Sequence, residues 1–371
     1  MSTAPVAPSL PLLALAAIDA AAVRALGVIA EAHTLAAPAS PAEPAVAIST
    51  PASPIAAVIQ SAASAQGGLA PLFADLAVAL QAPDLPPPVF AAAAKVQALA
   101  TPLDPPPTAA ALKAATTQSG LLLEASLAQS GAPPSLDLKA ALLSLRQALA
   151  DAMAEGSPPA AALTAAAPES GAATPQPAIH APIPPPPPYD SAALRAQPAV
   201  APRLTPDTPW PVLVRVLMQG VSGAIARQVL YQLASAPSAP LASGAPPAQP
   251  HWLFEIPLAT QQGVSPTPFE IARDGGRAPR GRQDGEPQWR ARFSLELGTA
   301  GVVHARVAVG NGRARVTLWA ERPDTAAVLD GRRGALAADL TAQAFDPSVA
   351  VFPGQPPNAA VDPGRFLDQV L

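Results

Sequence analysis

The tryptophans and prolines of this chain are divided between its two ends. All four tryptophans lie after residue 209, whereas 34 of the 51 prolines precede residue 210. Large aromatic side chains supply much of the area that a small core buries, while proline removes a backbone donor and interrupts regular structure. The sequence therefore predicts one well-packed domain in the C-terminal part of the chain and a looser N-terminal part.

Charge and cysteine content exclude several kinds of protein. Residues 1–209 carry 7 basic and 13 acidic residues, and residues 210–371 carry 15 arginines and 13 acidic residues, so neither part resembles a nucleic-acid-binding polycation. Cysteine is absent, which excludes disulfides, thiolate nucleophiles and cysteine-ligated metals. The apolar run from Leu10 to Ile18 is too short for a membrane span and lacks the basic residues that precede a secretory signal. We expect neither nucleic-acid binding nor membrane insertion.

The N-terminal part divides into three segments. Residues 1–54 are rich in Ala, Pro, Ser and Thr and are expected to be mostly disordered, with one possible helix near residues 12–32. Residues 55–155 show helical apolar spacing interrupted by prolines, which predicts weakly packed short helices. Residues 156–209 are of low complexity and predict a proline-rich linker. Two apolar stripes carry the helix prediction: Leu69, Leu72, Phe73, Leu76 and Leu80, then Leu138, Leu142, Leu145 and Leu149.

Residues 210–352 predict a two-layer α+β domain in which helices cover an antiparallel sheet. A helix is expected over 210–235, followed by strands that alternate apolar and polar residues from residue 252 onward. A second helix to about Ala344 and a last strand over 348–352 complete the domain, and the two helices are expected to cover the sheet. The tail, residues 353–371, is expected to be loose, although Phe366, Leu367 and Val370 could pack back onto the domain.

The sequence Gly310-Asn311-Gly312 predicts the register of one hairpin. A two-residue type I′ turn at Asn311-Gly312 places Val309 opposite Ala314 and keeps the apolar residues of both strands on one face. A three-residue loop would mix the two faces, so the pattern favours the shorter turn. His304 then lies opposite Trp319 on the outer, polar side.

Catalytic patterns are not found. The four histidines are scattered, without the spacing of a metal-binding helix, and the Gly-Asn-Gly turn lacks the later glycine and the helix of a phosphate-binding loop. His304 could act as a base, but an outward strand histidine is more often part of a cross-strand packing pair. The sequence predicts no enzyme activity, no metal and no cofactor.

Partner binding is the remaining kind of site. The candidate residues are Arg290, Arg292, His304, Arg306 and Trp319 on the outer side of the sheet, with Arg273 and Arg277 in a nearby glycine-rich loop. Arginines beside a tryptophan favour a binding hot spot. Two other readings stay open: the loop arginines could simply be solvated, and Trp319 could pack against a helix.

Several segments resemble flagellar hook-length control proteins of the alphaproteobacterial type. They are Trp252-Leu-Phe-Glu-Ile-Pro-Leu258, Phe269 to Gly276, Trp289 to Gly298 and the hairpin from Gly301 to Glu321. In the N-terminal part, Gln66 to Leu76 and Asp137 to Arg146 are also similar to segments of that family. The resemblance is good over 252–352 and patchy over 55–155.

The resemblance implies a protein that starts in the cytoplasm and is exported through the flagellar type III apparatus to the growing hook or the medium. Its implied partners are the export gate protein and the hook and hook-cap proteins, and its C-terminal domain would switch export from hook to filament subunits. Fully extended, 209 residues reach roughly 700 Å, but only about 300 Å as helix, so measuring would require unfolding. The alternative is a secreted or surface protein with a Pro/Ala stalk and a C-terminal binding domain.

Overall fold

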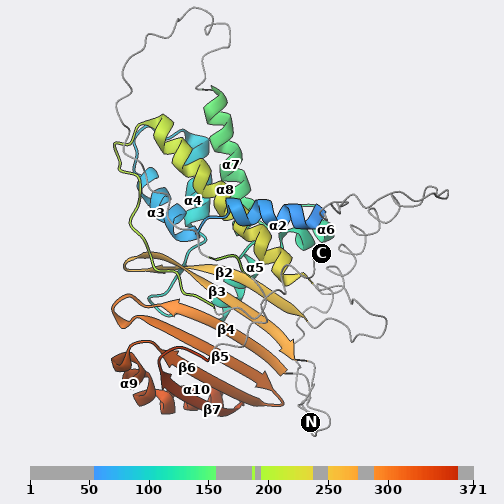
Figure 1. Cartoon of the computed structure of the whole chain (residues 1–371), viewed down its shortest axis with the longest axis vertical. Helices are drawn as coiled ribbons and strands as arrows, with labels where there is room; N and C mark the ends of the chain where they lie inside the picture. Colours follow the sequence, from blue (N-terminus) through green and yellow to red (C-terminus); the bar gives the residue numbers. More distant parts are fainter. Residues whose placement is uncertain (1–53, 156–185, 189–193, 237–249, 275–287, 358–371) are drawn as a thin grey trace, which may run out of the picture.

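The computed structural model describes residues 54–155, 186–188, 194–236, 250–274 and 288–357. In these residues a group of helices stacks against one end of a seven-stranded sheet, and two further helices lie at the other end (Figure 1). The predictions for residues 1–53, for most of the linker and for the tail beyond Pro357 concern residues outside these ranges.

The helices begin and end where their sequences suggest. Pro87 lies in the first turn of its helix, where a missing N–H costs nothing, as does Pro211. Thr108 caps another helix by accepting a hydrogen bond from the Ala111 amide at 3.2 Å, and Gly131 ends a fourth in the left-handed conformation. The helices are α2 (Pro54–Ala65), α3 (Leu69–Ala79), α4 (Pro87–Gln97), α5 (Ala109–Thr117), α6 (Leu123–Ser130), α7 (Leu138–Glu155) and α8 (Trp210–Ser235).

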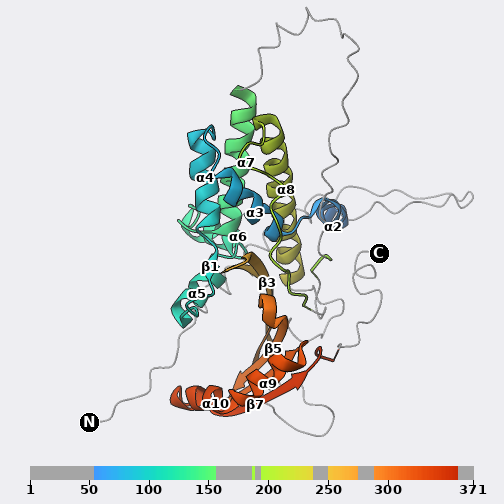
Figure 2. The ribbon, with the colours of Figure 1, turned by 90° about the vertical axis from the view of Figure 1, so that its left-hand side faces the viewer.

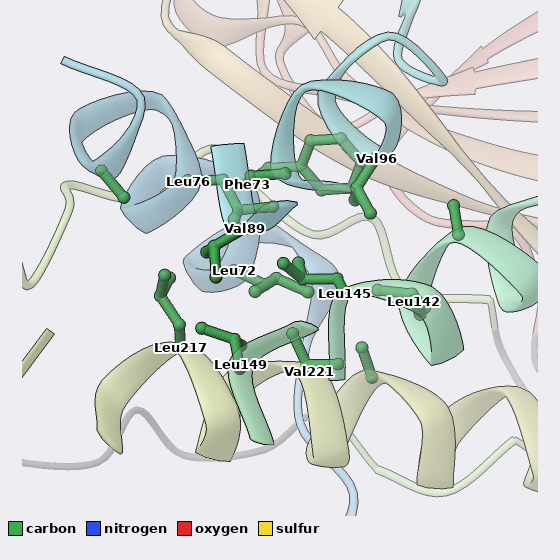
Figure 3. Close-up of a cluster of buried hydrophobic side chains, with 14 of the residues drawn as sticks. Leu72, Phe73, Leu76, Val89, Val96, Leu142, Leu145, Leu149, Leu217 and Val221 are labelled. Atoms are coloured by element: carbon green, nitrogen blue, oxygen red, sulfur yellow. The ribbon is translucent and has the colours of Figure 1, made fainter. Parts of the chain in front are cut away.

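Helices α3, α4, α7 and α8 share a continuous hydrophobic core (Figure 3). Both predicted leucine stripes point into it, and Leu142, Leu145 and Leu149 of α7 are completely buried. Weak packing was expected because the segment 55–155 contains few aromatic residues. The structure differs because α8 brings Leu217 and Val221 into the same core, so the helices before the linker are closed by a helix after it.

The seven strands follow one another in the sheet in the order of the chain. They are β1 (Thr101–Pro102), β2 (His251–Thr260), β3 (Gly263–Asp274), β4 (Gln288–Glu296), β5 (Val302–Gly310), β6 (Arg313–Ala320) and β7 (Asp346–Pro353). The α+β class is as predicted. The sheet is mixed, however, because β1 and β7 each pair in parallel with their neighbour.

The parallel pairing of β7 follows from the helices before it. A parallel neighbour requires a crossover connection, which α9 (Pro323–Gly331) and α10 (Arg333–Ala342) supply between β6 and β7. One helix was predicted here, but two form, with the break at Arg332 between two glycines, Gly331 and Gly334. Glycine weakens a helix interior, which makes this the natural place for the break.

The β5–β6 hairpin has the predicted register. Val309 faces Ala314, Val307 faces Val316, and His304 faces Trp319. Asn311 and Gly312 both have positive φ, at 52° and 70°, as a type I′ turn requires.

The register gives the sheet one apolar and one polar face. The apolar face runs from Phe254 and Phe269 through Phe293 and Val307 to Val351, and stacked aromatic pairs connect β2, β3 and β4 on it. Helix α5 covers this face at β2, and α9 covers it near Ala320. The two predicted covering helices therefore lie on different faces, because α8 packs on the polar face of β2, through Arg227 against Glu255.

Residues 194–208, here called the strap, lie between the helices and the polar face. Their backbone carbonyls accept hydrogen bonds from the sheet, Leu194 from Ser294 Oγ at 2.8 Å and Gln197 from Ser265 Oγ at 2.6 Å. At the other end, Arg203 pairs with Asp75 of α3, whose side chain is completely buried. This end of the predicted linker is thus a packed element, because polar groups of α3 and the sheet bind its backbone and side chains.

Candidate functional site

The polar face brings together five of the seven predicted site residues. Arg290 and Arg292 lie on β4, His304 and Arg306 on β5, and Trp319 on β6. Arg292 is directly opposite Arg306, and His304 is opposite Trp319. This arrangement results from period-two alternation, which puts every second residue of neighbouring strands on the same side.

Arg290, Arg292 and Arg306 form what is here called the arginine patch, with Glu270 of β3 as the buried carboxylate beside it. Arg292 forms an ion pair with Glu270, which also lies 3.7 Å from His251 Nε2. Burial would raise the pKa of Glu270, but hydrogen bonding to His251 and the charge of Arg292 outweigh burial and lower it. Glu270 is therefore held as an anion.

The guanidinium groups of the patch repel one another. The pKa of Arg306 is lowered, first by burial and then by the charges of Arg292 and Arg290, while Glu270 offsets only part of this. Like charges placed this close favour an added anion, which would reduce the repulsion. The patch is thus suited to an acidic partner surface.

Aromatic side chains continue the patch toward β7. The Arg306 guanidinium lies 5.7 Å from the centre of the Trp319 ring, and Trp319 stacks on Phe352 with the ring centres 6.1 Å apart. Trp319 lies on the outer side, as the hairpin register predicted, and it is only 9% exposed because Arg306 and Phe352 cover it. Phe352, which was not predicted, is 47% exposed and is the accessible aromatic of this surface.

His304 is also buried, within a chain of hydrogen bonds. Its Nδ1 lies 2.7 Å from Ser294 Oγ, and its Nε2 lies 3.2 Å from Glu321 Oε1. Serine, histidine and a carboxylate in sequence can act as a nucleophile, a base and an orienting acid. Ser294, His304 and Glu321 follow this order, so the accessibility of Ser294 decides between a catalytic and a structural role.

The geometry fits a structural role. Ser294 is 2% exposed and its hydroxyl donates to the Leu194 carbonyl of the strap, so its Oγ accepts from His304 and is closed to a substrate. The Glu321 oxygen that contacts His304 also accepts a hydrogen bond from Gln355 at 2.9 Å. The chain of bonds joins the strap, β4, β5 and the segment after β7.

The remaining two predicted residues are not part of this surface. Arg273 lies on the apolar face, 5.6 Å from the centre of the Trp289 ring. Arg277 lies outside the described residues, as does most of its loop.

The sequence reasoning missed a buried polar network between α8 and β2. Glu255 is completely buried, and its Oε1 accepts hydrogen bonds from Arg227 at 2.9 and 2.7 Å and from Tyr231 at 2.6 Å. Arg227 also binds Gln66, next to α2, and the Pro186 carbonyl. The sequence feature that could have revealed this network is Glu255, a single glutamate within the apolar run of β2, together with Arg227 in the buried half of α8.

Within the described ranges, no group of three or more His, Asp or Glu side chains could hold a metal ion. None of the helices described has the length and apolar character that crossing a bilayer requires.

Comparison with protein families matches residues 279–360 to the family described as flagellar hook-length control protein FliK. The match includes β4 to β7 with α9 and α10, and so contains all three arginines of the patch. The helical core, β2 and β3 precede the matched residues. Comparisons with curated proteins and with solved structures found no match.

Proposed function

We propose that this chain, which belongs to the flagellar hook-length control family by its residues 279–360, is an exported measuring protein. Its C-terminal domain would switch the type III apparatus from hook to filament subunits. In this proposal the protein leaves the cytoplasm through the flagellar channel and reaches the growing hook or the medium. Its partners would be the export gate protein, and the hook and hook-cap proteins.

The observation that carries the proposal is the coincidence of the matched family domain with the arginine patch. Arg292 and Arg306 lie on neighbouring strands within residues 279–360, and together they outnumber the one buried carboxylate beside them. A fixed basic surface next to the exposed Phe352 fits an acidic partner surface with an apolar contact. We assign the patch as the surface that contacts the export gate.

The helical core affects how such a protein could measure the length of the hook. As folded helices, α2 to α7 are too compact to span a long distance, since a helix rises only about 1.5 Å per residue. Unfolded during export, the same residues extend by more than twice as much. In the proposed mechanism measurement occurs in transit, and the folded structure described above is the state before export.

Hook length tests the family function directly. A strain lacking the gene is expected to make hooks of uncontrolled length, and the full-length chain supplied in trans is expected to restore them. Electron microscopy of isolated hooks measures this. Hooks of normal length in the deletion strain would reject the function and favour the alternative of a secreted or surface binding protein.

A binding measurement tests the assigned surface separately. Full-length Arg306→Glu is expected to bind the cytoplasmic domain of the export gate protein at least about tenfold more weakly, because charge reversal removes the electrostatic match. The matched control is Arg215→Glu, which changes an exposed arginine of α8 away from the patch. Equal binding by both variants would exclude the patch while leaving the hook-length function standing.

A further inference from the structure

Strand β7 is the last strand of the sheet and, in the described structure, has a neighbouring strand on one side only. Figure 2 shows it at the end of the sheet farthest from helices α3, α4, α7 and α8. The opposite edge of the sheet is covered, because β1 pairs with the end of β2 and the Leu253 amide of β2 donates to Ser235 Oγ of α8 at 2.8 Å. Among the described strands, β7 therefore presents the edge at which another chain can pair.

The backbone groups of β7 alternate between facing β6 and facing outward. Asp346 donates its amide to the Gly312 carbonyl at 2.7 Å, and Gly354 donates to the Ala320 carbonyl at 2.8 Å. The register between these two bonds is continuous, so the even-numbered residues of β7 face β6. The residues that face away from β6 are Pro347, Val349, Val351 and Pro353.

The two prolines limit where a partner strand can pair. Proline has no N–H, and proteins place it on edge strands to prevent uncontrolled pairing. Pro347 and Pro353 enclose Val349 and Val351, each of which offers both an N–H and a C=O to a new neighbour. A segment of about five extended residues, the length of an ordinary strand, fits between the prolines. The edge is thus suited to one short added strand.

The side chains beside this edge favour an acidic segment. Arg313 and Arg315 of β6 are exposed on the polar face, next to β7. Arg313 lies 3.8 Å from Asp346, whereas Arg315 has no ion pair within the described ranges. These two arginines extend the positive charge of the arginine patch to the edge of the sheet, where the exposed Phe352 adds an apolar contact.

We propose that an extended acidic segment of the export gate protein pairs with β7 and adds to the sheet as a further strand. In this mode of recognition the main-chain hydrogen bonds supply affinity, and alternate side chains supply specificity. Every second residue of the segment lies on the polar face, on the side of Arg315, and the residues between lie next to Val349 and Val351 on the apolar face. The inference rests on the proposed function, because that function supplies the partner.

Amide hydrogen exchange in the native full-length chain, followed by NMR, tests this pairing residue by residue. In the free protein β6 is expected to protect the amides of Ser348 and Ala350, while those of Val349 and Val351 exchange freely. Adding the cytoplasmic domain of the export gate protein is expected to slow exchange at Val349 and Val351 by at least about tenfold, because their amides become hydrogen-bonded. Ser348 and Ala350 serve as the internal control.

The other results of the exchange measurement overturn the inference. Gate binding without slower exchange at Val349 and Val351 rejects the pairing but leaves the hook-length function in place, since the deletion strain tests that function separately. Protection of these two amides in the free chain that grows with its concentration means that a second copy occupies the edge. Absence of gate binding rejects the pairing together with the assigned arginine patch.

Two pairs of substitutions test the hydrogen bonds and the charge. Val349→Pro removes an outward N–H and is expected to weaken gate binding at least about tenfold, whereas Ala350→Pro removes an N–H that faces β6 and should instead lower the melting temperature. Arg315→Glu is expected to weaken binding by at least about tenfold, and its control Arg332→Glu, an exposed arginine between α9 and α10, to bind normally. Unchanged binding by Val349→Pro, or equal binding by the two arginine variants, overturns the inference. If Val349→Pro does not fold, the exchange measurement on the native chain decides.

Discussion

The buried network between α8 and β2 predicts an unequal response to removing one or both of its charges. Glu255→Gln keeps the shape of the side chain but removes the carboxylate that pairs with Arg227, whose side chain is 5% exposed. In the native protein the charge of Glu255 raises the pKa of Arg227, even though burial acts to lower it. A buried cation left without its partner costs about 3 to 5 kcal/mol of unfolding free energy.

Replacing both charged residues should restore most of that loss. In Arg227→Met with Glu255→Leu, neither buried charge remains, and apolar side chains of similar volume fill the space, so the cost is expected to fall within about 2 kcal/mol of the native chain. Tyr231 and Gln66 still lose their hydrogen bonds to the replaced side chains, which accounts for the remaining cost of about 2 kcal/mol.

Urea unfolding followed by tryptophan fluorescence measures both variants, since Trp210 and Trp252 lie on the two elements that the network joins. The reasoning fails if Glu255→Gln loses less than about 1 kcal/mol, or if the double variant is as unstable as the single one. The first outcome would mean that water reaches Arg227, and the second that the apolar side chains do not fill the site.

Three other substitutions test separate contacts. Gly223→Ala should cost about 1 to 3 kcal/mol of stability in urea unfolding, because its Cβ would lie 2.8 Å from the backbone nitrogen of Gly67. Glu270→Gln should make stability fall less steeply in acid, as measured from thermal midpoints. The pKa of Glu270 in the folded protein is lowered below 4.5, so the stability that the ionised carboxylate contributes is complete above that pH and is lost as the pH falls through the folded pKa. Ser294→Ala should cost about 1 to 3 kcal/mol, because it leaves His304 Nδ1 and the strap carbonyl without their shared partner.

Each of these substitutions has a matched control. Gly220→Ala would meet the flexible end of Leu72 at 3.2 Å and should be milder than Gly223→Ala. Glu296→Gln, on the neighbouring strand, is the control for Glu270→Gln because it removes a carboxylate other than the one paired with Arg292. The exposed Ser348→Ala should leave stability unchanged. A pair that behaves alike would contradict the contact assigned to its first member.

What could be predicted from sequence was local. The leucine stripe of α7 and the Asn311-Gly312 turn each depend on residues a few positions apart, so period and turn chemistry were sufficient for both. The polar side of the hairpin was also correctly assigned. The burial of that side could not be predicted, because the residues that cover Trp319 and Ser294 come from β7 and from the strap.

The unpredicted features all depend on distant pairing. Arg227 and Glu255 are 28 residues apart, and Arg203 and Asp75 are 128 residues apart, so no periodic pattern connects them. The same reason explains why α8 was assigned to the sheet alone: its apolar stripe shows that it is buried but does not show against what. The binding role of the arginine patch remains a prediction for the measurements above.

The order of the strands determines how the sheet yields to a mechanical load. Each strand from β2 to β7 pairs with the strands next to it in the chain, so tension from the N-terminal side reaches β2 only after the helices and the strap have come away. Pulling at His251 then opens the β2–β3 hairpin from its free end, one rung at a time. Each cross-strand hydrogen bond contributes about 1 kcal/mol, and because these bonds break one after another, the force needed is that of breaking a single bond. Strands β6 and β7 are the last pair to separate.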